Sequence, residues 1–204
     1  MPGNLAKHIQ AEMKTSPPRG WRHVGTEEPV LAAALSSALG YTPAADLVIE
    51  SKSSGQRVWI ELEISRADPV ANHAKFAVAH MVERFDGTFV AMMSPHVAAG
   101  RRRLAAHTVA MMRRLEMEAF QTSLFPQLSG PDVKALNHML PAELARCCPP
   151  LKPEWQRVLA VVKPFADADG HRILFVGDPA EVRWNAFCWN RDVATDHGHR
   201  LWGG

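Results

Sequence analysis

The chain has 204 residues, of which 47% are hydrophobic and 22% are charged. This length predicts one domain with at most a small appendage, and the composition excludes a disordered chain or a coiled coil. The formal net charge of +2 is too small to indicate nucleic-acid binding by itself. No apolar run approaches the roughly 18 residues of a membrane span, and three cysteines make no disulfide framework. We expect a soluble, cytoplasmic protein with no membrane partner.

Residues 1–25 are expected to form an irregular segment, because prolines and a glycine interrupt its pattern. A helix is predicted next, with Thr26 as its N-cap and Gly40 as its stop. Glu27 and Glu28 then lie in its first turn, where the helix dipole favours acidic side chains. The apolar stripe expected to face the core consists of Leu31, Ala34, Leu35, Ala38 and Leu39.

Two strand-like runs follow, over residues 46–51 and 57–65, and a short Ser-Gly segment between them predicts a hairpin. If the turn is centred between Ser54 and Gly55, Asp46 lies opposite Glu63. Side chains of a strand alternate between two faces, so the register assigns each residue to one of them. The expected core face carries Leu47, Ile49, Val58, Ile60, Leu62 and Ile64, and the other face carries Asp46, Val48, Glu50, Trp59, Glu61 and Glu63.

Asp68 and Pro69 predict the N-cap and first position of a second helix, which ends at Asp86-Gly87. Strands are predicted over residues 88–93 and 117–122, and a third helix over 100–115. The residues expected to face inward are Val70, Ala74, Ala77, Val78, Met81, Val82 and Phe85 in the second helix and Leu104, Thr108, Met111 and Leu115 in the third.

Residues 26–125 therefore predict an α/β core in which a mixed central sheet is flanked by helices on both faces. Residues 126–204 are rich in proline, which predicts short helices. A second hairpin is predicted there over 172–177 and 181–189. We interpret this part as a smaller C-terminal extension packed on the core.

Three carboxylates converge on the non-core face of the first hairpin. Asp46 begins one strand, and Glu61 and Glu63 lie two residues apart on its partner. Clustered carboxylates repel one another unless a positive charge balances them. Mg²⁺ prefers oxygen ligands and often takes only one or two carboxylates. A second interpretation is that the glutamates lie on the solvent face of an ordinary sheet and pair with Arg57 or Arg66.

Asp46, fourteen further residues and then Glu61-Leu62-Glu63 resemble the PD-(D/E)xK nuclease motif. The pattern is similar in particular to the E-x-E version of some type II restriction enzymes, and the order of elements resembles the restriction-endonuclease-like core. The resemblance implies that Asp46 and Glu61 hold Mg²⁺, for which Mn²⁺ can substitute. Glu63 takes the position of the usual lysine, as general base or extra ligand.

The same resemblance extends to residues outside the motif. Lys75, on the next helix, is a second candidate for the role of the usual lysine. Glu27 or Glu28 corresponds to a glutamate that the family often carries on the preceding helix. The arginine run at 101–103, consisting of Arg101, Arg102 and Arg103, is the candidate contact to DNA phosphates.

The resemblance implies a Mg²⁺-dependent endonuclease that hydrolyses double-stranded DNA, most specifically a type II restriction endonuclease. A DNA repair nuclease would use the same chemistry. Many such enzymes act as homodimers, although the sequence shows no interface. The alternative from another class is a catalytically inactive module of the same fold that binds nucleic acid or protein.

Overall fold

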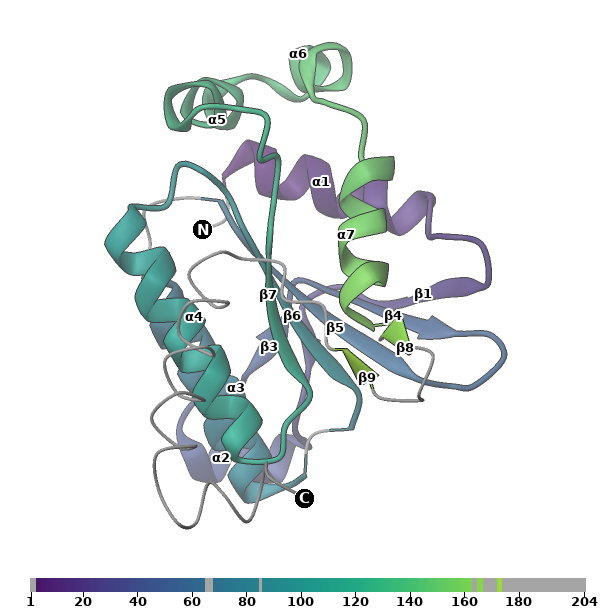
Figure 1. Cartoon of the computed structure of the whole chain (residues 1–204), viewed down its shortest axis with the longest axis vertical. Helices are drawn as coiled ribbons and strands as arrows, with labels where there is room; N and C mark the ends of the chain where they lie inside the picture. The colour runs from purple at the N-terminus through teal and green to yellow at the C-terminus, as the bar shows by residue number, and fades with distance from the viewer. Residues whose placement is uncertain (1–2, 65–67, 85, 163–164, 167–171, 174–204) are drawn as a thin grey trace.

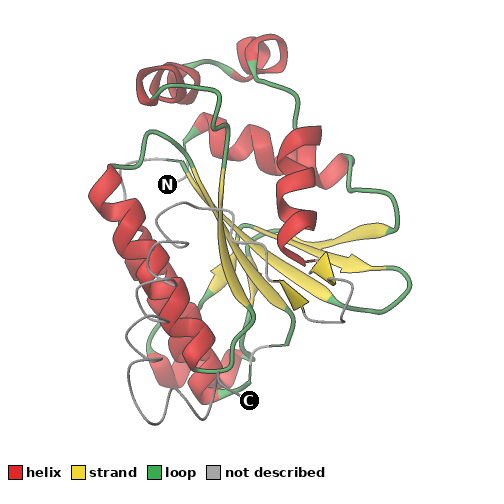
Figure 2. Cartoon of the chain, viewed as in Figure 1, coloured by secondary structure: helices red, strands yellow, loops and turns green. Residues whose placement is uncertain are grey.

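The computed structural model describes residues 3–64, 68–84, 86–162, 165–166 and 172–173. Its centre is a five-stranded sheet in the order β1-β4-β5-β6-β7 (Figures 1 and 2). β1, β4 and β5 pair antiparallel, whereas β5, β6 and β7 pair parallel. The expected α/β class with a mixed central sheet is confirmed. The strands are Trp21–Gly25 (β1), Leu47–Ser51 (β4), Arg57–Glu63 (β5), Thr88–Met93 (β6) and Ala119–Ser123 (β7).

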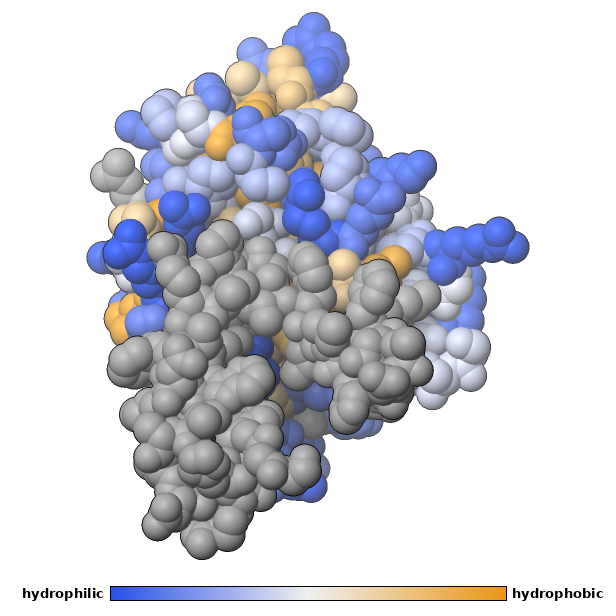
Figure 3. All heavy atoms as spheres, in the orientation of Figure 1, coloured by the Kyte–Doolittle hydropathy of each residue, from blue (hydrophilic) through white to orange (hydrophobic). Residues whose placement is uncertain are grey.

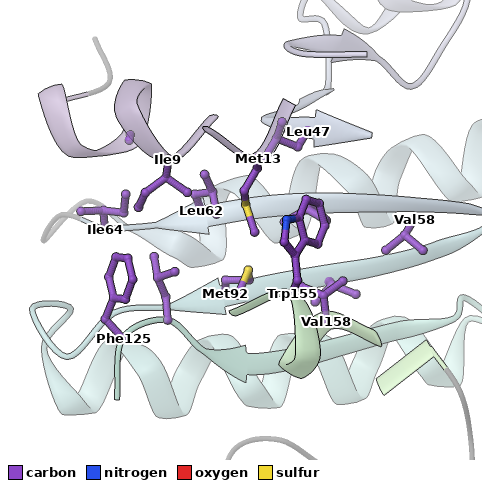
Figure 4. Close-up of a cluster of buried hydrophobic side chains, with 14 of the residues drawn as sticks. Ile9, Met13, Leu47, Val58, Leu62, Ile64, Met92, Phe125, Trp155 and Val158 are labelled. Carbon is purple, nitrogen blue, oxygen red and sulfur yellow. The ribbon is translucent and has the colours of Figure 1, made fainter. Parts of the chain in front are cut away.

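Helices cover both faces of this sheet (Figure 1). Helices α3 (Pro69–Val82) and α4 (Ala99–Arg114) connect the parallel strands and enclose one apolar cluster against the sheet. The larger cluster, on the other face, joins the sheet to four further helices. These are α1 (Asn4–Thr15), α5 (Gly130–His138), α6 (Pro141–Cys147) and α7 (Lys152–Val162). Figure 4 shows the side chains from two of them, Ile9 and Met13 of α1 and Trp155 and Val158 of α7.

The faces predicted for the first hairpin are confirmed, but its register is shifted. Leu47 pairs with Ile60 and Glu50 with Arg57, so the turn is centred earlier than expected. Relative to the predicted register, each residue of β4 pairs with a residue of β5 that is an even number of positions away from the expected partner. Side chains alternate between the faces with a period of two, so every side chain stays on its predicted face. The six residues expected on the core face all belong to the larger cluster, whereas Val48 and Trp59 belong to the cluster under α3 and α4.

The expectation of an irregular segment over residues 1–25 was wrong. The segment contains α1 and the edge strand β1, which pairs with β4. Leu5, Ile9 and Met13 are fully buried and recur every four residues, which is the spacing of one helix face. The prolines that suggested an irregular chain follow this helix and lie in its connection to β1, so they do not interrupt it.

The helix predicted from Thr26 begins later than expected. Glu28–Pro29 forms a short strand, β2, that pairs antiparallel with β3 (Ala44–Ala45), and Glu27 has a positive φ of 52°. Helix α2 therefore spans only Ala33–Leu39, and of its predicted apolar stripe only Leu31, which precedes the helix, is buried. Gly40 ends it in the left-handed conformation, as predicted.

The predicted start of α3 is confirmed, since the Asp68 side chain accepts a hydrogen bond from the backbone N–H of Val70. The predicted inward faces of α3 and α4 were largely wrong. Small and aromatic side chains such as His73, Phe76 and Ala105 are buried instead, while Met81 is 70% exposed. Both helices carry apolar residues on two sides, so periodicity alone selected the wrong side. Among the other residues predicted to face inward, Thr108 is buried and Phe85 lies outside the described residues. Those that are exposed are Ala74, Val78, Val82, Leu104, Met111 and Leu115.

The short helices predicted after Pro126 are confirmed as α5, α6 and α7. Arg172–Ile173 (β9) pairs antiparallel with Phe165–Ala166 (β8), and the rest of the predicted second hairpin lies outside the described residues. In the part of the chain that the structure describes, no helix combines the length and apolarity required to span a bilayer. The described part of the face in Figure 3 is mainly hydrophilic, with small apolar patches.

Gly87, which precedes β6, and Gly100, which lies in α4, provide a matched test of the close packing between Gly87 and β5. Gly87 has φ +104°, and a Cβ added there would lie 2.5 Å from the carbonyl oxygen of Arg57. Gly87→Ala should therefore destabilise the protein by more than about 2 kcal/mol in denaturant unfolding. Gly100, inside α4, has open space where an added methyl group would lie, so Gly100→Ala should be neutral or stabilise by up to about 1 kcal/mol. Equal effects of the two substitutions would contradict this packing.

Candidate functional site

The three predicted carboxylates lie together at the end of β5. Asp46 directly precedes β4, and Glu61 and Glu63 lie in the last three residues of β5 on the face toward α3. Glu61 is only 6% exposed and Glu63 only 4%. The interpretation that both glutamates lie on a solvent-exposed face was therefore wrong. Arg57 pairs with Glu50 instead, at 3.2 Å, and Arg66 lies outside the described residues.

Asp46 is held in place by two hydrogen bonds. Its Oδ2 accepts from the backbone N–H of Leu62 at 2.7 Å, which ties it to the strand that carries both glutamates. Its Oδ1 accepts from the side-chain amide of Gln10 at 3.0 Å. The same Gln10 nitrogen lies 3.3 Å from Oε1 of Glu27. Gln10 therefore joins α1 to the acidic site and brings Glu27 to its edge.

Glu63 is oriented by a neighbour on α3. The side-chain amide of Asn72 donates to Glu63 Oε1 at 2.9 Å. Asn72 lies one turn after the Asp68 cap, so the start of α3 determines its position. Neither Gln10 nor Asn72 was predicted as a site residue. Gln10 was missed because α1 was not predicted, and Asn72 carries no signal in the sequence that distinguishes it from a surface residue.

The electrostatics of the site disfavour negative charge. Burial raises the pKa of Glu61 well above its ordinary value, and the neighbouring carboxylates raise it further. Burial is also the main reason why the pKa of Asp46 rises to about 6 and that of Glu63 increases. The hydrogen bonds from Leu62 and Asn72 offset part of these increases. The carboxylates are therefore close enough to repel one another, and burial reduces the solvent screening of this repulsion.

Another buried glutamate shows how this protein otherwise balances such a charge. Glu154 is fully buried, and both of its oxygens accept hydrogen bonds from Arg157, the shorter at 2.8 Å. It also accepts from the backbone N–H of Phe125. No cationic side chain among the described residues forms an ion pair with Asp46, Glu61 or Glu63. The acidic site thus lacks the compensation that Glu154 has.

The predicted basic residues lie outside this cluster. Lys75 is exposed on α3, and no ion pair or hydrogen bond joins it to the carboxylates, so the structure does not bring it into the site. The arginine run lies in the first turns of α4, with Arg101 and Arg103 exposed and Arg102 half-buried. This helix begins beyond the end of β6, where the N–H of Ser94 donates to the carbonyl of Glu63. The arginines and the carboxylates therefore share one edge of the sheet.

The donor atoms at this edge are suited to a hard divalent cation. Carboxylate oxygens are the ligands that Mg²⁺ and Mn²⁺ prefer, and Mg²⁺ binds through as few as one or two of them. Among the described residues, no three His, Cys, Asp or Glu side chains are placed so that together they could hold a metal ion. Asp46 and Glu61 are the two residues that fit best, because they lie across one hairpin and interact electrostatically.

Comparison with known proteins gave no assignment. No protein-family model, no curated protein and no solved structure matches the chain. A functional conclusion for this chain must therefore come from the chemistry of the site.

Proposed function

We propose that this protein is a divalent-metal-dependent endonuclease that hydrolyses DNA phosphodiester bonds. The observation that carries the proposal is a group of carboxylates, the buried Glu61 and Glu63 and the half-buried Asp46, without an ion-pair partner among the described residues. Buried charges of one sign persist in proteins where a cation or a proton balances them. A divalent cation bound for catalysis explains why the site keeps three acids rather than amides.

The arrangement of elements supports the PD-(D/E)xK resemblance within this proposal. Apart from the short elements β2, α2 and β3, which lie between β1 and β4, the order α1, β1, β4, β5, α3, β6 is similar to the helix, strands, helix and strand of that core, with α1 in place of the helix expected after Thr26. The side chain from the preceding helix is then Gln10, which contacts Asp46 directly. Glu27 remains beside it, although it does not lie on a helix.

Each residue has a distinct role in the proposed reaction. Asp46 and Glu61 would hold the cation, which supplies charge stabilisation for the phosphate and its leaving oxygen. Glu63 has Oε1 fixed by Asn72, which leaves Oε2 to accept a proton from the attacking water. Its raised pKa suits proton transfer nearer to neutral pH than an ordinary glutamate allows. The arginine run on α4 would position the DNA backbone.

Cleavage of plasmid and unmethylated phage DNA tests this proposal. We expect the purified protein to cut DNA with Mg²⁺ or Mn²⁺, and Glu61→Ala/Glu63→Ala to lose at least about a thousandfold in rate. Discrete fragments would support the type II restriction form, and a smear would support a repair or non-specific nuclease.

Two controls show whether cleavage depends on a divalent metal and whether it depends on Lys75. EDTA should abolish cleavage, and Lys75→Ala should retain it, because Lys75 lies outside the carboxylate cluster. If no DNA is cut and no divalent metal binds, the nuclease proposal is wrong and the inactive binding module is favoured. Loss of cleavage in Lys75→Ala would instead contradict the role given to Glu63.

A further inference from the structure

A cavity of about 490 Å³ lies between α1 and α7, away from the carboxylates. His8 and Glu12 of α1 form one wall, and Trp155 of α7 belongs to the opposite one. Gln10, which contacts Asp46, lies on another side of α1, so the two sites use different faces of the same helix. A volume of this size lies within the range of roughly 300–1,000 Å³ that is typical of small-molecule sites.

The floor of the cavity is apolar. Trp155 is only 6% exposed, and Leu151, Leu159 and Cys148 pack against the larger core cluster beside it. Burial, followed by nearby acidic side chains, raises the pKa of Cys148 to about 11, so its thiol is neutral at physiological pH. The indole Nε1 of Trp155 is buried and has no hydrogen-bond partner in the described structure. A flat aromatic group would fit such a floor.

The rim of the cavity is polar and has more positive than negative charge. Arg19 and Lys152 are exposed on it, and Glu12 is its one lining carboxylate among the described residues. No described side chain forms an ion pair with Arg19 or Lys152. Both cations are therefore available to an anionic group on a molecule whose apolar part reaches the floor.

We propose that this cavity binds a small planar apolar molecule that carries one anionic group. The apolar floor selects the aromatic part, and Arg19 and Lys152 select the anion. The inference does not depend on nuclease activity, because neither cation belongs to the carboxylate site.

Two matched fluorescent probes test the proposal by titration calorimetry: anilinonaphthalene sulfonate and its uncharged parent, phenylnaphthylamine. The sulfonate should bind the folded protein with one-to-one stoichiometry and more tightly than the uncharged probe. Arg19→Gln/Lys152→Gln should weaken sulfonate binding by about tenfold and leave the uncharged probe within about twofold. Near-uniform binding of both probes to both proteins would overturn the anion preference.

A cavity-filling variant distinguishes binding in this cavity from nonspecific binding elsewhere on the surface. Ala145 is exposed on α6 and lines the cavity, so Ala145→Trp should block both probes without disturbing the core. Ala142→Trp, on the same helix but outside the cavity lining, should leave binding unchanged. Near-ultraviolet circular dichroism verifies that each variant is folded. Absence of binding to the wild type, or equal binding to both tryptophan variants, would refute the site.

Discussion

Glu61→Gln should stabilise the metal-free protein by about 1–3 kcal/mol and remove the stabilisation that Mn²⁺ gives to the wild type. Glutamine keeps the shape of the side chain and removes a buried acid whose charge is opposed by burial and by its neighbours. The same change removes a proposed metal ligand. Urea unfolding with EDTA and with Mn²⁺ measures both effects, and the variant should give nearly the same curve in each.

Glu50→Gln is the matched control for this experiment. Glu50 lies on the adjacent strand β4, but it pairs with Arg22 and Arg57 at the opposite end of the hairpin. Its substitution should change the stability only slightly, because ion pairs at the surface contribute little, and it should leave the Mn²⁺ effect intact. A Glu61→Gln protein that is less stable than the wild type in EDTA would show that Glu61 is not a destabilising charge.

Acidification should destabilise the protein through His73. This side chain is fully buried between α3 and the sheet, packs edge-on against Phe89, and neither ring nitrogen has a hydrogen-bond partner of normal geometry among the described residues. Burial lowers its pKa from 6.5 to about 4, and the opposing effects of the Ala105 backbone and Asp68 are smaller. The unfolded chain therefore binds the proton first as the pH falls. Stability of roughly 3 kcal/mol should be lost between pH 6.5 and about 4.

His73→Leu isolates this contribution, because leucine has a similar volume and does not titrate. Asp46, with its pKa raised to about 6, acts in the opposite direction, since it destabilises the folded state as the pH rises. The difference in unfolding free energy between variant and wild type, measured from pH 8 to 4, cancels the carboxylate effect. This difference should grow in favour of His73→Leu as the pH falls. A constant difference would contradict the buried, neutral histidine.

The central hairpin and its acidic face could be predicted from the sequence because strand periodicity is robust. The turn was misplaced, yet Leu47 and Ile60 still lie on the core face and Glu61 on the other. A one-residue slip in the pairing would have reversed both assignments. The helix cap at Asp68 was also predictable, because it depends on local hydrogen bonding.

Other features depend on tertiary contacts that a linear pattern does not contain. The side of α4 that faces the sheet carries Ala105 and Val109 rather than Leu104 and Met111. The burial of Glu61 was not predicted, because alternating polar residues usually indicate a solvent-exposed face. Gln10 reaches Asp46 only because α1 packs across the sheet, at a sequence distance of 36 residues.

Titration calorimetry with Mn²⁺ tests directly whether Asp46, Glu61 and Glu63 hold a divalent cation. The wild type and Glu50→Gln should each give a binding isotherm. Asp46→Asn and Glu61→Gln should each abolish binding while the proteins remain folded. A wild type that binds no Mn²⁺, or a Glu61→Gln protein that binds it as well as the wild type, would contradict the proposed metal site.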